Sequence, residues 1–477
     1  MDFDSGAGLL HRLTSYQPDR EWDAPVDDRR VRHDLTPNDP ETFPPPYKTY
    51  GPGLPTVELP RDLPASGVPA TAVLSGAASP PQALDAAQLG RILFLGAGVV
   101  RTSVRNGRRF VFRAAGSAGA RFPLELYVSA RGVAGVPDGV HWYDPMAHAL
   151  LQIAPPAGGD ATTLIVTGVP WRTGWRYAER GFRHVYWDAG TLLAQLDAAT
   201  ASAGLEPRLR TLFPDTRVGE LVGADGTHEF PVALLTFGDG TPAVAPTGPA
   251  TAGELPPVEF PLVTAAQHAG DRDTLGAPWP AAVTVGTHPG EQTLDEVIRR
   301  RGSQRRMDRT KTVPRADLEW AMSAATRGVD VPHWVVAHGV DGLAPGLYRW
   351  PGLTPVVTGD LRGELERVCL GQSLAAEAAY VVIAARPGDA LDDRSYRAAQ
   401  LASGLVEGRL HLAAYATGAT ATGMTFLDSE VPALLHEPGD LVTLLFTCVG
   451  IGEYKSRPGG APGAPVEVRT VVPRIVE

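Results

Sequence analysis

The sequence predicts an α+β fold that occurs twice in one chain, so that two similar copies face each other as a pseudodimer. Three observations favour this prediction. The 477 residues suffice for more than one domain with a buried core. Apolar segments of strand and helix length recur over residues 84–240 and again over residues 290–477. Matching residues occur in the same order in both regions, as expected for an internal repeat.

The first match is a turn punctuated by glycine. Residues 132–139 read Gly-Val-Ala-Gly-Val-Pro-Asp-Gly and residues 339–346 read Gly-Val-Asp-Gly-Leu-Ala-Pro-Gly, with glycine at the same three positions. Each stretch follows a short β-rich run, which indicates a strand, a turn and a returning strand. The second match is an arginine and a glycine with equal spacing on two expected long helices. These pairs are Arg183 with Gly190, and Arg397 with Gly404.

Four regions follow one another along the chain. They are a Pro-rich N-terminal arm (1–75), a first copy (84–240), a Pro/Ala/Gly linker expected to be irregular (241–289) and a second copy (290–477). The apolar patterns predict helices at 84–95, 181–203 and 294–301, and strands at 124–130, 163–167, 232–237, 334–337 and 441–448. The arm has little apolar periodicity, and we expect it to wrap around another surface.

The bulk properties exclude several classes of protein. A formal net charge of −10 and a pI near 5.7 argue against a general surface for nucleic acid or anionic membranes, so a basic cluster marks a local site. The longest apolar runs have only strand length, and the first residues lack a signal-peptide pattern. The two cysteines are far apart and lack metal-ligand spacing. These features predict a cytoplasmic protein without a metal site.

The most basic stretch is Ile-Arg-Arg-Arg-Gly-Ser-Gln-Arg-Arg-Met at residues 298–307, at the end of an expected helix. Arginines packed this closely, together with a serine, need an anionic partner. The alternative is a solvated helix end whose arginines complement the helix dipole.

The pattern Arg301-x-Ser303-x-Arg305 resembles the signature with which proteins of the nitroreductase superfamily hold the phosphate of flavin mononucleotide (FMN). The resemblance implies that these three residues contact the phosphate. Guanidinium groups suit this role because they form bidentate, charge-assisted hydrogen bonds to phosphate oxygens. Residues 450–457, Gly-Ile-Gly-Glu-Tyr-Lys-Ser-Arg, resemble the second basic phosphate clamp of that superfamily. The basic residues of this second clamp are Lys455 and Arg457.

Residues 115–127, Ala-Gly-Ser-Ala-Gly-Ala-Arg-Phe-Pro-Leu-Glu-Leu-Tyr, resemble a segment of SagB-type azoline dehydrogenases, a branch of the same superfamily. In those proteins the loop comes from the partner subunit and lies along the flavin ring, where small residues allow close backbone approach. The resemblance implies that Ser117, Gly119 and Ala120 line the flavin ring. The leading proline of the family segment is replaced here by Gly116.

The motifs are divided between the copies. The second copy has both basic clamps, but its residues 327–332, at the place of the ring-side loop, lack the serine. The first copy has the ring-side loop, but it ends in an acidic stretch, 237–240, where the second copy has a basic clamp. We therefore expect one FMN site at the seam between the copies and an empty pseudo-equivalent site, where a phosphate would be uncompensated. By resemblance, Thr422 and Gly423 take the place where a backbone amide points at the hydride-accepting flavin nitrogen. The alternatives are a plain helix-to-strand turn at these two residues, and two decayed copies that bind nothing.

The residues that act on the substrate are less clearly marked. The SagB-type resemblance points to a Lys-Tyr pair before the long helix as the base, and this chain has Arg176-Tyr177. Arginine is a poor base because it stays protonated. Tyr177 is expected to act if neighbouring guanidiniums lower its pKa. Alternatively, Arg176 orients an anionic substrate, or the pair merely flanks the helix.

The resemblance implies an FMN-dependent SagB-type dehydrogenase that oxidises an azoline or similar bond in a peptide-derived natural product, with oxygen reoxidising the flavin. Its partners would be that peptide or small-molecule substrate, other biosynthetic enzymes and a second copy of the chain in a homodimer. One alternative is a nitroreductase-like reductase that takes electrons from NAD(P)H. Another is a flavin-lacking scaffold that binds a peptide or an enzyme through the Pro-rich arm.

Overall fold

The computed structural model describes residues 1–477 except 5, 19–30, 32–36, 106, 255 and 470–477. The N-terminal arm contains α1 (Gly6–Thr14), η1 (Pro40–Thr42), β1 (Thr56–Glu58) and α2 (Ala70–Leu74). The first copy contains α3 (Ala86–Ala97), β2 (Val99–Arg105), β3 (Arg108–Arg113), η2 (Ala118–Ala120), β4 (Leu124–Ala130), β5 (Gly139–Asp144), β6 (Ala149–Ala154), β7 (Thr163–Gly168), α4 (Pro170–Tyr177), η3 (Ala178–Arg180), α5 (Gly181–Ser202), β8 (Pro207–Arg210), α6 (Asp215–Val222) and β9 (Phe230–Phe237).

The linker contains α7 (Pro261–Ala269). The second copy contains α8 (Leu294–Arg300), β10 (Val313–Pro314), α9 (Arg315–Thr326), β11 (His333–Ala337), β12 (Val340–Asp341), β13 (Gly346–Trp350), β14 (Thr354–Thr358), α10 (Arg362–Val368), α11 (Leu374–Glu377), β15 (Tyr380–Pro387), η4 (Gly388–Ala390), α12 (Asp393–Ala416), β16 (Thr420–Met424), η5 (Asp428–Glu430), α13 (Val431–Leu435), β17 (Leu441–Gly450) and β18 (Val466–Glu467). Among the described residues, the helices are too short or too polar to cross a membrane.

The two copies contain sheets with the same strand order. In the first copy the strands lie in the order β6-β5-β4-β7-β9-β8, and the arm adds β1 at the edge beside β6. In the second copy the order is β14-β13-β11-β15-β17-β16. Neighbouring strands are antiparallel throughout both sheets. Chain order and spatial order are both repeated, as expected for two copies of one α+β fold.

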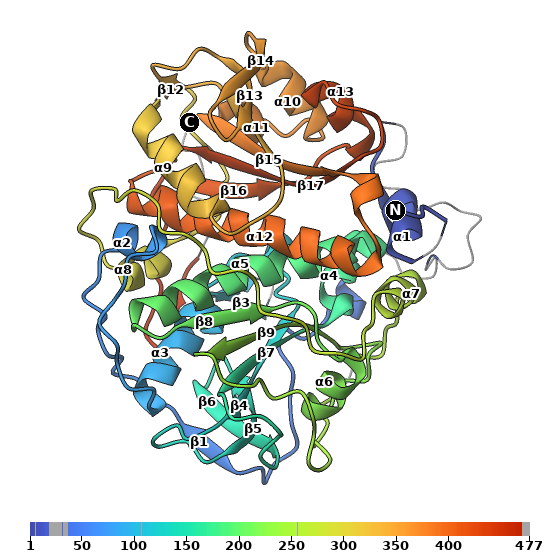
Figure 1. The fold of residues 1–477 in the computed structure, drawn as a ribbon, viewed down its shortest axis with the longest axis vertical. Helices are drawn as coiled ribbons and strands as arrows, with labels where there is room; N and C mark the ends of the chain where they lie inside the picture. The colour runs from blue at the N-terminus through green and yellow to red at the C-terminus, as the bar shows by residue number, and fades with distance from the viewer. Residues whose placement is uncertain (5, 19–30, 32–36, 106, 255, 470–477) are drawn as a thin grey trace.

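The long helices α5 and α12 cross between the two sheets, as Figure 1 shows, and pack closely at two glycines. A Cβ atom on Gly190 would lie 2.2 Å from the carbonyl oxygen of Leu401, and one on Gly404 would lie 2.2 Å from that of Trp187. Leu401 precedes Gly404 by the same three positions by which Trp187 precedes Gly190. The helices therefore cross at a pseudo-twofold axis, about which the two glycines that the sequence matched occupy equivalent positions.

Buried ion pairs repeat this symmetry. Two arginines near the start of each long helix bind one aspartate of the opposite copy. Asp215 lies between β8 and β9, and Asp428 lies between β16 and β17. The N–O distances are 2.7 Å for Arg180–Asp428, 2.6 Å for Arg183–Asp428, 2.5 Å for Arg394–Asp215 and 3.2 Å for Arg397–Asp215. The matched arginines of the sequence thus fasten each copy to the other.

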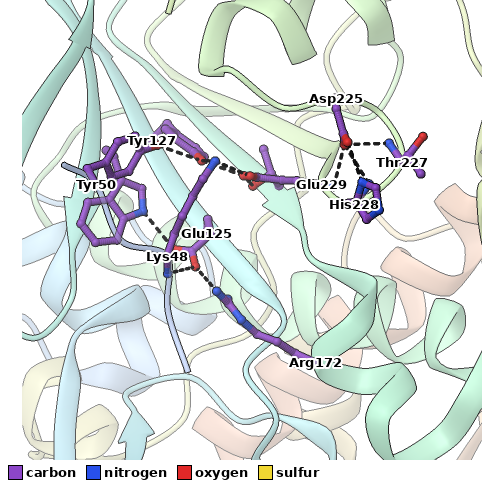
Figure 2. Close-up of polar contacts among 11 residues, drawn as sticks. Lys48, Tyr50, Glu125, Tyr127, Arg172, Asp225, Thr227, His228 and Glu229 are labelled. Atoms are coloured by element: carbon purple, nitrogen blue, oxygen red, sulfur yellow. Dashed lines mark hydrogen bonds and ion pairs between the residues drawn. The ribbon is translucent and has the colours of Figure 1, made fainter. Parts of the chain in front are cut away.

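The N-terminal arm is fixed to the first copy by buried charges, shown in Figure 2. Lys48 Nζ lies 2.5 Å from Glu229 Oε2, and the Lys48 backbone amide donates to Glu125 Oε1 at 2.8 Å. Arg172 pairs with the same Glu125 carboxylate at 2.5 Å, and the Tyr127 hydroxyl donates to Glu229 at 2.7 Å. Ion pairs buried this deeply are stable only when every charge has a partner, as here. The described residues at this end of the arm therefore wrap the chain's own first copy.

The linker is not irregular throughout, contrary to expectation. Pro261–Ala269 form α7, in which Leu262, Val263 and Ala266 are buried. Proline at the first helical position is favourable, and the buried residues share one helical face, which packs against α1 and α12. The Pro-rich composition around this short helix concealed it.

Candidate functional site

Two adjoining cavities, of about 350 and 460 Å³, lie at the seam between the copies. We call the first the helix-side cavity, because α5 and α12 border it, and the second the basic cavity. Every residue that the sequence proposed for a flavin or substrate site lines at least one of them. The helix-side cavity is lined by Ser117, Gly119, Arg176, Tyr177, Ser303, Arg305, Thr422 and Gly423. The basic cavity is lined by Ser117, Gly119, Ala120, Arg176, Arg301, Ser303, Arg305, Lys455 and Arg457.

The loop 301–305 is held in place by hydrogen bonds at Gln304. Its backbone N–H donates to the carbonyl of Ala421 at 3.3 Å, and its carbonyl accepts from Thr422 Oγ1 at 2.6 Å. Its buried side chain donates to the carbonyl of Tyr454 at 3.0 Å. One residue between the candidate phosphate ligands thus connects the loop to β16 and to the C-terminal segment.

Tyr415 of α12 brings the two predicted clamps together. Its hydroxyl donates to the carbonyl of Gly302 at 3.0 Å and lies 3.2 Å from Ser456 Oγ. Gly302 and Ser456 are adjacent to candidate ligands of the first and second clamp. Lys455 and Arg457 are exposed at the rim of the basic cavity. The geometry allows the two clamps to approach one anion from two sides.

Arg301 links the clamp to the first copy. Its Nε and Nη2 atoms donate to the carbonyl of Ala114 at 3.1 and 2.9 Å, while Nη1 is buried without a hydrogen-bond partner among the described residues. A Cβ atom on Gly116 would lie 3.3 Å from this Nη1, so the glycine leaves room for the guanidinium. Burial lowers the pKa of Arg301, because the charged form loses solvation. A buried cation with a free donor favours an anionic ligand.

The lining of the basic cavity contains arginines and a lysine but no aspartate or glutamate within the described part of the chain. Four of these cations, Arg101, Arg105, Arg113 and Arg121, were not predicted from the sequence. Arg101 lies on β2 and donates to the carbonyl of Arg457 at 2.7 Å. Burial lowers the pKa of Arg101 to about 10, and nearby Arg301 lowers it further. Burial also lowers the pKa of Arg121 to about 10, and there nearby Arg176 adds to the effect. Such mutual repulsion is relieved when an anion binds.

The ring-side loop is positioned by Asp188 of α5, another residue that sequence patterns missed. Ser117 Oγ donates to Asp188 Oδ2 at 2.5 Å, and the Ala118 amide donates to Oδ1 at 3.0 Å. The Phe122 amide donates to Ser117 Oγ at 2.7 Å, which closes the turn. Burial raises the pKa of Asp188 well above its ordinary range. No sequence pattern marks Asp188 as a partner of this loop, because it lies on a helix that is far from the loop in sequence.

Gly119 shows why this loop needs small residues. Its φ of 58° lies in the left-handed region, and a Cβ atom there would lie 2.7 Å from the Tyr177 hydroxyl and 2.8 Å from Arg176 Cδ. Ala120 also has a positive φ, of 54°. The loop therefore lies directly on the Arg176-Tyr177 pair, so two motifs that the sequence treated separately form one wall.

The condition under which Tyr177 would act as a base, a lowered pKa, is not met. Burial raises its pKa, and this outweighs the opposing effect of Arg176. The ring stacks on His184 with centroids 4.0 Å apart, and the pKa of His184 is lowered well below its ordinary value by burial and by Arg180. Tyr177 is thus a neutral phenol that can donate a hydrogen bond, and is not poised as a base.

Glu407 supplies a carboxylate to the helix-side cavity and was also not predicted. It lies on α12, and its Oε1 is 2.3 Å from the position that a Cβ atom on Gly423 would take. His411 Nε2 lies 3.5 Å from the same oxygen. Gly423 therefore leaves room for the carboxylate beside β16. Glu407 and Asp188 are the acidic residues among the described residues that line this cavity.

The seam site has the features required by a ligand that joins a phosphate to a flat ring. The buried free donor of Arg301 and the acid-free lining of the basic cavity suit a phosphate dianion. The helix-side cavity offers small residues and a glycine-bearing strand as walls. The combined volume is in the range of natural cofactor sites. The residues present thus fit FMN.

Comparison with known proteins gives the family. No family model matches the chain. A protein of Methanocaldococcus jannaschii, provisionally named as a nitroreductase, is 30% identical over 166 residues, which are 32% of this chain and 79% of the relative. A crystal structure from Anabaena variabilis, provisionally described as a nitroreductase, has 21% identity and a TM-score of 0.72, covering 94% of this chain and 100% of that chain.

A second crystal structure, from Ralstonia eutropha and of the same provisional description, covers 40% of this chain and 92% of its own at 21% identity, with a TM-score of 0.31. The Anabaena match extends over both copies, so it concerns the whole arrangement of the fold. The identity to the Methanocaldococcus protein adds a relationship in sequence to this likeness in fold. The chain belongs to the nitroreductase family of oxidoreductases and has the nitroreductase-like α+β fold.

Proposed function

We propose that this protein binds one FMN at the seam and uses it as a SagB-type dehydrogenase, oxidising an azoline or a similar bond in a peptide-derived natural product. One observation carries the proposal: motifs from opposite copies line two adjoining cavities, and the larger is basic without a carboxylate among its described residues. A site divided in this way needs both copies.

The candidate ligands divide by chemistry. Arg301, Ser303 and Arg305 would hold the phosphate from one side, with Lys455 and Arg457 at the rim. The ring-side wall would be Ser117, Gly119 and Ala120, and the opposite wall would be Thr422 and Gly423. When bound, FMN supplies a two-electron acceptor for hydride.

A residue of this chain must accept the proton that the substrate loses. We assign it to the Glu407 carboxylate, since Arg176 stays protonated and burial raises the pKa of Tyr177. Oxidation of an azoline removes one proton and one hydride. Glu407 would accept the proton, and bound FMN would supply the acceptor for the hydride, with oxygen as the final acceptor of the two electrons. Tyr177 would donate a hydrogen bond to the substrate, and Arg176 would bind an anionic group of it.

The second candidate is a reductase fed by NAD(P)H, because the named relatives are described as nitroreductases. A scaffold that binds partners through the arm has less support. Much of the described arm packs on its own chain: β1 pairs with β6, and Lys48 is buried.

The visible spectrum of the purified protein tests the cofactor. We expect oxidised-flavin absorbance, with FMN released on heating at one molecule per chain. Two per chain would contradict a single seam site, and none would contradict FMN binding. Arg301→Gln should release the flavin on gel filtration, whereas Arg315→Gln, which removes an exposed arginine of α9, should retain it.

The substrate is tested under anaerobic conditions. A thiazoline-containing peptide should bleach the flavin and lose two hydrogen atoms by mass spectrometry, while NADPH alone should not bleach it. Glu407→Gln should slow bleaching by roughly 100-fold or more with unchanged FMN content, the usual effect of removing a general base. Rapid bleaching by NADPH without the peptide would favour the reductase. Undiminished bleaching in Glu407→Gln would remove Glu407 as the proton acceptor.

A further inference from the structure

A third cavity, of about 340 Å³, lies where the pseudo-twofold axis places the counterpart of the helix-side cavity. It is lined by Leu193 and Leu405. These residues are the helix equivalents of Glu407 and Thr191, which line the helix-side cavity. Strand β8 takes the place of β16. We call this space the second seam cavity.

The linker builds one wall of the second seam cavity. The Trp279 amide donates to the carbonyl of Leu209 at 2.7 Å, and its indole Nε1–H donates to Thr211 Oγ1 at 2.9 Å. Further along, the Val285 amide donates to the carbonyl of Ser75 at 2.9 Å. The linker is therefore held on both sides of the cavity and borders it without filling it.

The charges of this cavity do not cancel. Arg208 lies 2.8 Å from Glu206, and Arg409 lies 3.4 Å from Asp197. Arg327 has no such partner: within the described residues its guanidinium forms no ion pair, and its buried Nε atom has no hydrogen bond. Two of the three guanidinium groups are thus paired, and one remains free to bind an anion.

The free guanidinium lies against a glycine of the first half of the chain. A Cβ atom on Gly76 would lie 2.9 Å from Arg327 Nη1, so only a glycine allows this approach. Burial lowers the pKa of Arg327 and Arg409 lowers it further, while the Asp197 carboxylate opposes both effects. The remaining walls combine the paired charges with apolar side chains, which include Trp279, Leu193, Ala201, Leu205, Leu209 and Leu235.

We propose that the second seam cavity binds a small organic acid with a flat apolar body. Its carboxylate pairs with Arg327, and its body lies between Trp279 and the leucines of α5 and β8. A guanidinium forms bidentate bonds to a carboxylate, and a volume of about 340 Å³ is at the small end of the range of ligand pockets. The proposal does not depend on FMN at the other site.

Calorimetric titration with benzoate, in buffer without other carboxylates, tests this site. We expect saturable binding of one benzoate per chain with a Kd of roughly 0.1–1 mM, as suits one charge-assisted pair and a small apolar body. Benzamide, which has the same shape without the charge, should bind at least tenfold more weakly. Trp279 fluorescence should change on titration, and this signal should be absent in Trp279→Phe.

Two variants test whether benzoate binds in the second seam cavity. Arg327→Gln should weaken benzoate binding at least tenfold, and Ala201→Leu, which places a larger side chain in the cavity, should weaken it without altering Arg327. Both should retain the FMN content of the unmodified protein, and Arg315→Gln should bind benzoate normally. The proposal is overturned if benzoate binding does not saturate at concentrations up to about 10 mM. It is also overturned if both variants bind undiminished, or if only Arg301→Gln abolishes binding.

Discussion

The two seam cavities use equivalent backbone positions for different chemistry. Glu407 lines the helix-side cavity, whereas its equivalent Leu193 lines the second seam cavity. Thr191 and Leu405 form a second such pair of equivalents, again with the polar residue on the helix-side cavity. The helix crossing preserves the symmetry of the backbone, while the side chains differ. A pseudosymmetric frame thus supports two sites that carry different side chains at equivalent helix positions.

The arginines at the seam show the same contrast. In the flavin candidate site, Arg301 comes from the clamp loop and lies against Gly116 of the ring-side loop. In the second seam cavity the roles are exchanged, since Arg327 comes from the loop that corresponds to the ring-side loop and lies against Gly76. In each site, one guanidinium therefore contacts a glycine on the other side of the seam. Among the described lining residues, only the flavin candidate site has further unpaired cations.

The largest effect is expected at the mirrored ion pairs. Asp428→Asn leaves Arg180 and Arg183 buried without a counter-charge, and should lower the free energy of unfolding by about 3–5 kcal/mol. Asp215→Asn should cost less, because Arg397 keeps Asp271 at 3.0 Å. Urea unfolding of both variants measures the difference. Equal losses would show that the two sets of ion pairs are energetically symmetric.

The same aspartate predicts a pH dependence. Burial opposes ionisation of Asp428, but Arg180 and Arg183 outweigh it and lower its pKa. A lowered folded-state pKa gives stability that is present above the unfolded pKa of about 3.9 and is lost as pH falls through the folded value. The deficit of Asp428→Asn should therefore be constant near neutral pH and shrink below about pH 4. A deficit that grows on acidification would contradict the assignment.

The helix crossing should show the next largest effect. Gly404→Ala and Gly190→Ala each place a Cβ atom 2.2 Å from a carbonyl oxygen, so we expect each to destabilise the protein by about 2–3 kcal/mol. Similar losses for both would support the pseudo-twofold axis. Gly363→Ala is the control, since no atom lies within 4 Å of a Cβ atom at this position of α10. It should leave stability unchanged or raise it.

The clamps should differ in strength. Arg301→Gln removes a buried, charge-assisted donor and should weaken FMN binding by about 2 kcal/mol, or roughly 30-fold. Lys455→Gln removes an exposed charge at the rim and should weaken it by less than about 1 kcal/mol, with a smaller difference at high salt. Fluorescence titration of apoprotein with FMN at two salt concentrations measures both. A larger loss for Lys455→Gln would reverse the assigned importance of the two clamps.

The sequence predicted most of the frame because the frame has local signals. Three elements occur as expected: the strands at 124–130 and 163–167 and the long helix from 181. The spacing of their apolar residues and the length of each apolar run specify them. The second glycine of each turn repeats the conformation as well as the spacing, with φ of 84° at Gly135 and 71° at Gly342. Such features depend on neighbouring residues alone.

The features that the sequence did not predict depend on tertiary contacts. Asp188 and Glu407 lie on helix faces with no distinguishing pattern, and only the crossing of α5 and α12 turns them into the cavity. Arg101 reaches the clamp from a hairpin far away in sequence. The direction of the pKa shift at Tyr177 has the same origin, because its charged neighbours were visible in the sequence but its burial was not.

The linker that joins the copies has one more consequence. In a homodimer, a site built from two subunits is lost when the protein is diluted below its dissociation constant. Here both walls of the seam belong to one polypeptide, so assembly of the site is unimolecular and independent of protein concentration. A substitution such as Arg301→Gln also changes one cavity only, so each cavity can diverge without altering its counterpart.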